Sequence, residues 1–160
     1  MSIRNVGLMS LGIVAIASGR WLGEALDVSV VSLSEAGTLL LLLALTLAIT
    51  RRGMTRLVAA IVATMLFIGA DAWGRWDTQA AFNECVVKGE AVRHALALYR
   101  SEHGHFPDDL SALSDIRVGR RMLRADLLRY RRVGDGFELS FGDQLATFTA
   151  SDAQPFAAHK

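Results

Sequence analysis

The sequence predicts a membrane protein with an α+β domain. Its last of three transmembrane helices continues into a long soluble helix that packs on a three-stranded antiparallel sheet. Three observations predict this fold class. The first 76 residues contain three long apolar stretches. The segment from Met54 to His103 contains no proline and changes midway from uniformly apolar to amphipathic. Short runs of alternating apolar and polar residues, separated by glycine turns, follow it.

The three apolar stretches predict spans at about residues 3–22, 28–50 and 54–73. Each reaches the roughly 20 apolar residues that a helix needs to cross a bilayer, once long end side chains that reach the interface are counted. Residues 1–17 also resemble a secretory signal peptide that would be cut after Ala17. We expect an uncleaved first span, because the chain begins at Met1.

The positive charges of the short loops predict the orientation. The link between the second and third stretches contains three arginines and no acid: Arg51, Arg52 and Arg56. Basic loops remain in the cytoplasm, so the N-terminus is expected there and the chain after Trp76 on the other side. All three tryptophans then fall at the outer interface, where indole rings accumulate. This divides the chain into a membrane region, 1–76, and an extracytoplasmic domain, 77–150.

The spans lack the residues that bind haem or conduct ions. No histidine occurs before His94, and no ionisable residue lies at the middle of a span. An intramembrane charge is the usual sign of transport. The spans instead carry small residues at helical spacing, which let helices approach closely: Ala15, Gly19, Gly23, Ala59 and Ala63. We interpret these positions first as packing within the bundle and, alternatively, as contacts with partner helices.

The outer half reads as one helix covered by strands. From Ala80 to His103 the apolar residues recur in steps of three and four, which predicts one buried stripe. Gly104, with Pro107 soon after, predicts the end of the helix. A short helix is expected over 107–113. Alternation and glycine turns predict strands that cover the stripe, at 127–133, 137–141 and 145–149. Residues 151–160 have no periodicity and are expected to form a flexible tail.

Three of these features together resemble one known family. Arg51-Arg52-Gly53-Met54-Thr55 before an apolar run resembles a cleavage-and-methylation signature. A helix that is half membrane-bound and half soluble follows it. The passage from Ala95 to Pro107 and Leu110-Ser111-Ala112-Leu113 then resembles the point where the soluble domain leaves that helix. Over about residues 51–149 the chain resembles type IV pilins and type II secretion pseudopilins. The resemblance implies a pilin-like fold, a processing site between Gly53 and Met54, and a bacterial inner membrane with a periplasmic domain.

The chain departs from the pilin pattern in ways that bear on function. After cleavage at Gly53, Val58 would be the fifth residue, where filament-forming members have glutamate. Arg56 places a charge where the family is apolar. Two further spans precede the site. A subunit held by three uncut helices is hard to withdraw from the bilayer into a filament, so the departures favour an anchored role.

The most unusual charge feature is a run of arginines between positions 117 and 132, predicted as a partner-docking surface. It comprises Arg117, Arg120, Arg121, Arg124, Arg129, Arg131 and Arg132. Arginine suits bidentate pairing with carboxylates or phosphates. The run is interpreted as a solvated surface that balances nearby aspartates, or as a docking surface for an acidic partner or lipid headgroups. DNA binding is the least favoured, because Tyr130 is the only aromatic residue within the run.

The sequence predicts no catalytic, cofactor or metal site. Cys85 and the histidines at 94, 103 and 105 fall on different helix faces or beside a cap, and no nucleophile or phosphate-loop motif occurs. Cys85 is expected to be a buried apolar residue. The prediction is therefore a non-catalytic accessory or scaffolding subunit of a larger bacterial inner-membrane complex, with other subunits and the bilayer as partners. The alternative is a pseudopilin-like component of a secretion, pilus or DNA-uptake machine. No small-molecule substrate is evident.

Overall fold

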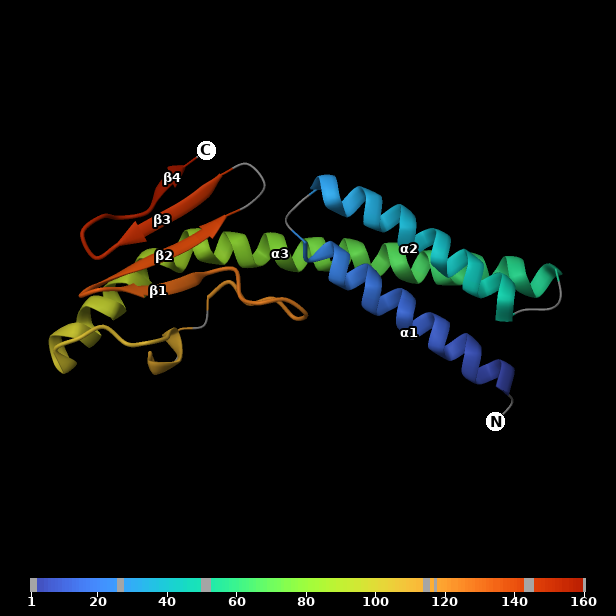
Figure 1. Cartoon of the computed structure of the whole chain (residues 1–160), viewed down its shortest axis with the longest axis horizontal. Coiled ribbons are helices and arrows are strands. Elements are labelled where there is room, and N and C mark those ends of the chain that lie inside the picture. The colour runs from blue at the N-terminus through green and yellow to red at the C-terminus, as the bar shows by residue number, and fades with distance from the viewer. Residues whose placement is uncertain are drawn as a thin grey trace. The chain divides into compact units, whose positions relative to one another are not determined.

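A computed structural model describes residues 3–25, 28–49, 53–113, 116, 118–142 and 146–159. The chain divides into two compact units, Met1–Asp77 and Thr78–Lys160. The helix α3 contributes residues to both units, and the units are described separately below (Figure 1).

The first unit consists of α1 (Ile3–Gly23), α2 (Val28–Ile49) and the first half of α3 (Gly53–His103). By length and composition alone, two of these helices are apolar enough to cross a membrane: α1 over Val6–Gly23, and α3. In the part of α2 that the structure describes fully, the apolar stretch is shorter, Ser34–Leu47. The prediction of three helical segments is confirmed. That all three cross a membrane stays a prediction.

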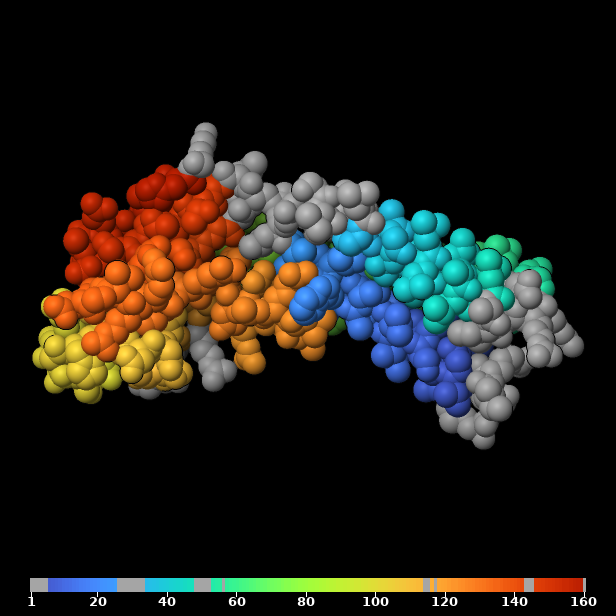
Figure 2. All heavy atoms as spheres, viewed as in Figure 1, coloured from blue at the N-terminus to red at the C-terminus, as the bar shows by residue number. Residues whose placement is uncertain are grey.

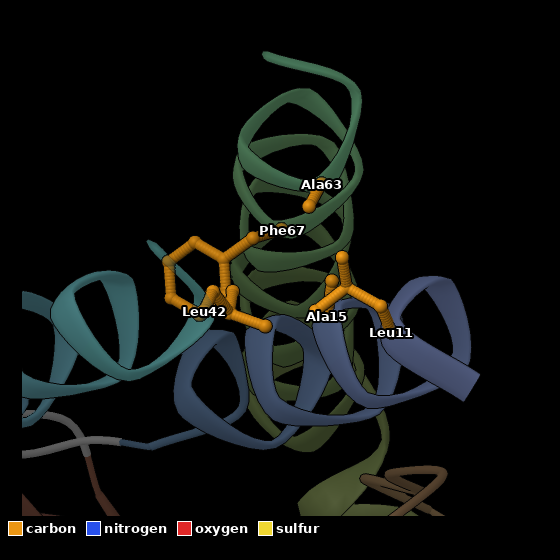
Figure 3. Packing of buried hydrophobic residues seen from close by; sticks show 5 residues of the cluster. All are labelled: Leu11, Ala15, Leu42, Ala63 and Phe67. Carbon is orange, nitrogen blue, oxygen red and sulfur yellow. The ribbon is translucent and has the colours of Figure 1, made fainter. Parts of the chain in front are cut away.

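All three helices contribute to one apolar cluster in the first unit. Figure 3 shows its members pointing toward one another: Leu11, Ala15, Leu42, Ala63 and Phe67, each at most 3% exposed. The small side chains of Ala15 and Ala63 leave room for the phenyl ring of Phe67 and the leucine side chains from the neighbouring helices.

The predicted long helix is confirmed, and it ends where the sequence indicates. α3 runs for 51 residues to His103. The next residue, Gly104, has a φ of +78° and its nitrogen donates a hydrogen bond to the Arg100 carbonyl oxygen, 2.8 Å away. This left-handed conformation favours glycine and closes the last helical turn.

In the second unit, α3 packs on an antiparallel sheet of four strands in the order β1-β2-β3-β4. The strands are β1 (Arg129–Val133), β2 (Gly136–Gly142), β3 (Thr147–Ser151) and β4 (Ala157–His159). The three predicted strands are present as β1 to β3, and the sheet has a fourth strand that was not predicted. The expected flexible tail 151–160 instead supplies the end of β3 and all of β4, with Phe148 opposite Ala158 and Thr149 opposite Ala157.

The helix stripe differs by one residue from the expected one. Ala81, Cys85, Val92 and Leu96 are buried. The steps of three and four also place Val86 in the predicted stripe, but it is 55% exposed. Steps of three and four are satisfied equally well by Cys85 and by Val86 from their neighbours, and the sequence alone favoured the larger apolar side chain. Cys85 is buried as predicted.

Aromatic rings join the helix to the sheet. Phe82 of α3 makes edge-to-face contacts with Phe141 and Phe148, at centroid distances of 5.7 and 5.9 Å. Phe156, from the segment before β4, contacts Phe141 at 5.1 Å. The predicted short helix near residue 110 is a single 3₁₀ turn, Leu110–Ala112, begun by Asp109.

Candidate docking surfaces

Helices α1 and α3 approach each other backbone to backbone through glycine. A Cβ built on Gly19 would lie 2.3 Å from the carbonyl oxygen of Phe67, and one on Gly23 would lie 2.1 Å from that of Asp71. From the opposite side, a Cβ on Gly74 would lie 2.7 Å from the carbonyl oxygen of Arg20. No side chain fits at these distances, so the crossing requires glycine at all three positions.

The other small residues predicted to pack also lie at helix contacts in the first unit. Ala15 and Ala63 are buried in the apolar cluster, and Ala59 is half-buried. Gly74 was not among the predicted packing residues. Ala70 lies one turn before Gly74, so the pair is a small-residue spacing that the sequence displays and that the prediction missed.

An apolar groove of about 250 Å³ lies between α1 and α3 in the first unit. Leu8 and Gly12 line it from α1, and Val58 and Ala59 line it from α3. Its walls are almost wholly apolar, so it can accept a lipid chain or the side chains of a neighbouring helix. Val58, which departs from the pilin pattern, belongs to this wall.

Two arginines tie the helices of the first unit together near their ends. Arg20 of α1, 8% exposed, pairs with Asp77 of α3, and its Nε lies 3.3 Å from Oε1 of the fully buried Glu24. The Arg20 guanidinium also lies 4.8 Å from the ring centroid of Trp73. The two carboxylates and the aromatic face offset part of the cost of burying the guanidinium, although its Nε and Nη1 atoms have no hydrogen-bond partner among the described residues.

The second arginine, Arg75, links a different pair of helices. Its guanidinium pairs with Glu35 of α2 and, through Nε at 2.8 Å, with Asp71 of α3. Glu35 and Asp71 both lie near the ends of predicted spans, but nothing in the sequence indicates that they pair with Arg75. Partners 40 and 57 residues apart in sequence leave no periodic signal.

The predicted arginine surface falls into two parts. Four of its members are exposed: Arg120, Arg129, Arg131 and Arg132. Arg121 and Arg124 are half-buried, and Arg117 lies outside the described residues. On the sheet, Arg131 pairs with Glu138 at 2.7 Å and Arg132 with Asp108 at 2.9 Å. The remaining described loop arginines (120, 121 and 124) lie in the segment before β1.

Two glutamates on α3 hold the chain segments around them. Glu84 accepts a hydrogen bond from the Gly119 nitrogen at 3.1 Å, and Glu90 accepts one from the Phe156 nitrogen at 3.1 Å. The hydrogen bond from Lys88, and then that from Gly119, lowers the pKa of Glu84. The pKa of Glu90 is lowered chiefly by its hydrogen bond with Arg93. Both carboxylates therefore act as structural acceptors at neutral pH.

The thiol of Cys85 and the histidines at the end of α3 do not form a common site. Burial raises the pKa of the Cys85 thiol to about 12, which keeps it protonated and unreactive at neutral pH. His103 stacks on Tyr99 at 4.0 Å, and His105 meets the same ring edge-on. Within the described residues, no group of three or more His, Cys, Asp or Glu side chains is arranged to hold a metal ion.

The polar groups close in sequence at the end of α3 do not converge. The Ser101 hydroxyl donates to the Leu98 carbonyl oxygen, and His103 Nδ1 is paired with the Tyr99 carbonyl oxygen. Both interactions are local to the helix.

Comparison with known proteins gives no relative. No protein-family model, no curated protein and no solved structure matches this chain.

Proposed function

We propose that this chain is a non-catalytic, membrane-anchored subunit of a larger bacterial inner-membrane complex. The observation that carries the proposal is the glycine crossing between α1 and α3. With Gly23 against the Asp71 carbonyl, α3 is locked to α1 by contacts that no side chain can replace. A helix held in this way suits a subunit that stays in the bilayer rather than one that is withdrawn into a filament.

The arginine pairs support the same role. Arg20 ties α1 to Asp77 of α3, and Arg75 ties Glu35 of α2 to α3. Each helix that precedes α3 therefore has its own ionic link to it. The Arg20 link has low exposure and therefore weakens little with salt, whereas the Arg75 link is half exposed and contributes less to the three-helix anchor.

We further propose that all three helices cross the membrane, with the N-terminus in the cytoplasm and residues 78–160 in the periplasm. The length of α2, 22 residues, is sufficient for a span. The positive-inside rule supports the orientation, through the arginines at 51, 52 and 56. Partner subunits would contact the apolar groove beside Val58 and the exposed arginines of β1 in the periplasmic unit.

A pseudopilin-like role is the second candidate. One observation favours it: α3 is a single helix whose first half is apolar and whose second half carries an antiparallel sheet. That arrangement agrees with the expected pilin-like fold and leaves the bond between Gly53 and Met54 at the start of the helix as a processing site.

Both candidates are tested by purifying the tagged chain from its native membranes in mild detergent and measuring its intact mass and its partners by mass spectrometry. An uncut chain in fixed ratio with one set of subunits supports the anchored role. A chain that begins at Met54 and copurifies with secretion or pilus components supports the pseudopilin role. An uncut chain without partners overturns the subunit proposal.

A further inference from the structure

The segment from Gly119 to Leu127, here called the arginine loop, is closed at its base. The Leu127 nitrogen donates to the Gly119 carbonyl oxygen at 2.6 Å, and the Gly119 nitrogen donates to Glu84 of α3 at 3.1 Å. Gly119 and Leu127 are both buried. Gly119 has a φ of +73°, and a Cβ there would lie 2.4 Å from the Cys85 sulfur. The base of the loop is thus fixed on the helix.

The loop is also braced internally. Arg121 Nε donates to the Ala125 carbonyl oxygen across the loop at 2.8 Å. This bond holds the residues between them in a turn, so little conformational freedom is left to lose when the tip binds something.

The tip of the arginine loop combines exposed apolar and basic side chains. Met122 is 73% exposed and Leu123 is 40% exposed, and exposed Arg120 precedes them. The three arginines at 120, 121 and 124 outnumber the one acid, Asp126. In Figure 2 the orange atoms of this part of the chain lie at the surface.

This combination is suited to the surface of a bilayer. Basic residues are attracted to anionic headgroups, while an apolar tip enters the boundary between headgroups and acyl chains. Glu84 and Cys85, the helix residues that contact the base of the loop, follow Trp76 by only eight and nine residues in sequence.

The chemistry favours lipid over the two other ligands that arginine can bind. A stable protein interface buries about 800 Å² on each partner, far more than two apolar side chains at a loop tip supply. Single-stranded nucleic acid requires aromatic platforms for its bases, and residues 119–127 contain no aromatic side chain.

We propose that the arginine loop binds anionic phospholipid in the bilayer that anchors the chain, with Met122 and Leu123 entering the interface. The inference rests on the membrane anchor of the proposed function. It adds a second attachment to the same leaflet, which would fix the periplasmic unit close to the membrane surface.

The test uses the full chain reconstituted in vesicles, with an environment-sensitive NBD fluorophore on the variant Met122→Cys. The native thiol at position 85 is fully buried, so labelling is confined to the new cysteine. A matched probe on Asp135→Cys reports the turn between β1 and β2, where Asp135 is exposed. Vesicles contain phosphatidylcholine alone or with phosphatidylglycerol, and lipids with a doxyl group act as quenchers.

With phosphatidylglycerol, we expect the emission at position 122 to shift to shorter wavelength and to be quenched by the doxyl lipid. The probe at position 135 should remain unquenched. Arg120→Glu should reduce the quenching at 122, whereas Arg129→Glu, the same charge change on exposed β1, should leave it unchanged. Equal emission and equal quenching at positions 122 and 135 in both vesicle types would overturn the inference.

The lipid contact and the subunit role can fail independently of each other. If the probe at 122 is quenched but native membranes yield no partner subunits, the lipid contact stands and the subunit role fails. If the probe is unquenched in vesicles but shielded in a purified native complex, the loop binds protein, and the lipid inference fails while the subunit role stands.

Discussion

Gly23 of α1 lies so close to Asp71 of α3 that a Cβ on the glycine would come within 2.1 Å of the Asp71 carbonyl oxygen. Gly19 makes the same kind of contact with Phe67 one turn earlier. At these two positions backbone meets backbone with no side chain between the helices, so a substitution there has a well-defined consequence.

Gly23→Leu should separate α1 from α3. Forcing a side chain against backbone costs roughly 1–3 kcal/mol or more, because neither helix backbone can move aside as a flexible side chain would. The thermal unfolding midpoint of the purified protein in detergent should fall. Gly69→Leu is the matched control on α3, since a Cβ at Gly69 meets nothing within 4 Å. An equal fall in both variants would contradict the glycine crossing.

Removing the Arg20 cation should destabilise the first unit more than removing Arg75. Arg20→Gln removes the cation paired with the fully buried Glu24, and breaking a buried pair costs about 3–5 kcal/mol. The Arg75 side chain is 48% exposed, and pairs at that exposure contribute about 0–1 kcal/mol. Urea unfolding followed by tryptophan fluorescence, which reports Trp73 beside Arg20, should give this order. A larger loss for Arg75→Gln would refute it.

Gly119→Ala should cost more stability than Gly104→Ala. Both glycines have a positive φ, +73° and +78°, so an alanine at either position pays a left-handed penalty of about 1–2 kcal/mol. At Gly119 the new methyl group would also meet the Cys85 sulfur at 2.4 Å, whereas at Gly104 it meets nothing within 4 Å. Denaturant unfolding monitored by circular dichroism measures the difference. Equal losses would show that the close contact with Cys85 is unimportant.

The hydrogen bonds that Glu84 accepts from Lys88 and Gly119 should appear in the pH dependence of stability. The folded-state pKa of Glu84 is lowered from 4.5, mainly by its hydrogen bond with Lys88 and then by that with Gly119. A lowered folded-state pKa gives stability that is present above the unfolded value and is lost as the pH falls through the folded value. The unfolding midpoint of the wild-type protein should therefore exceed that of Glu84→Gln at neutral pH, and this difference should shrink below pH 4.5.

Glu102→Gln, on an exposed position of the same helix, serves as the control for that experiment. It should change the midpoint little at neutral pH. If Glu102→Gln and Glu84→Gln gave the same pH dependence, the effect would be one of net charge, and the hydrogen bonds of Glu84 with Lys88 and Gly119 would not be its cause.

The native thiol gives a further prediction that needs no substitution. Because burial raises the pKa of Cys85 to about 12, the folded protein should not react with a thiol reagent such as DTNB at pH 8. Reaction should begin only when the second unit unfolds in denaturant. Rapid reaction without denaturant would place the thiol at the surface and contradict the packing of Gly119 against it.

The sequence by itself determined the helices and most of the sheet. Uniform apolar runs, the absence of proline between Met54 and His103, and Gly104 as a cap are local signals that act through helix propensity and hydration. Alternation with glycine turns likewise predicted β1 to β3. These features depend on residues a few positions apart, which is why one sequence displays them.

The tertiary structure decided what those signals left open. The strand at Ala157–His159 has no alternation of its own, and it forms because β3 offers it an edge and Glu90 accepts the Phe156 nitrogen. The choice of Cys85 over Val86 as the inward residue, the pairing of Arg20 with Asp77, and the role of Gly74 all arise from contacts between distant segments. Such contacts depend on the distance between two segments of backbone in the folded protein. The spacing of residues along the chain does not indicate that distance.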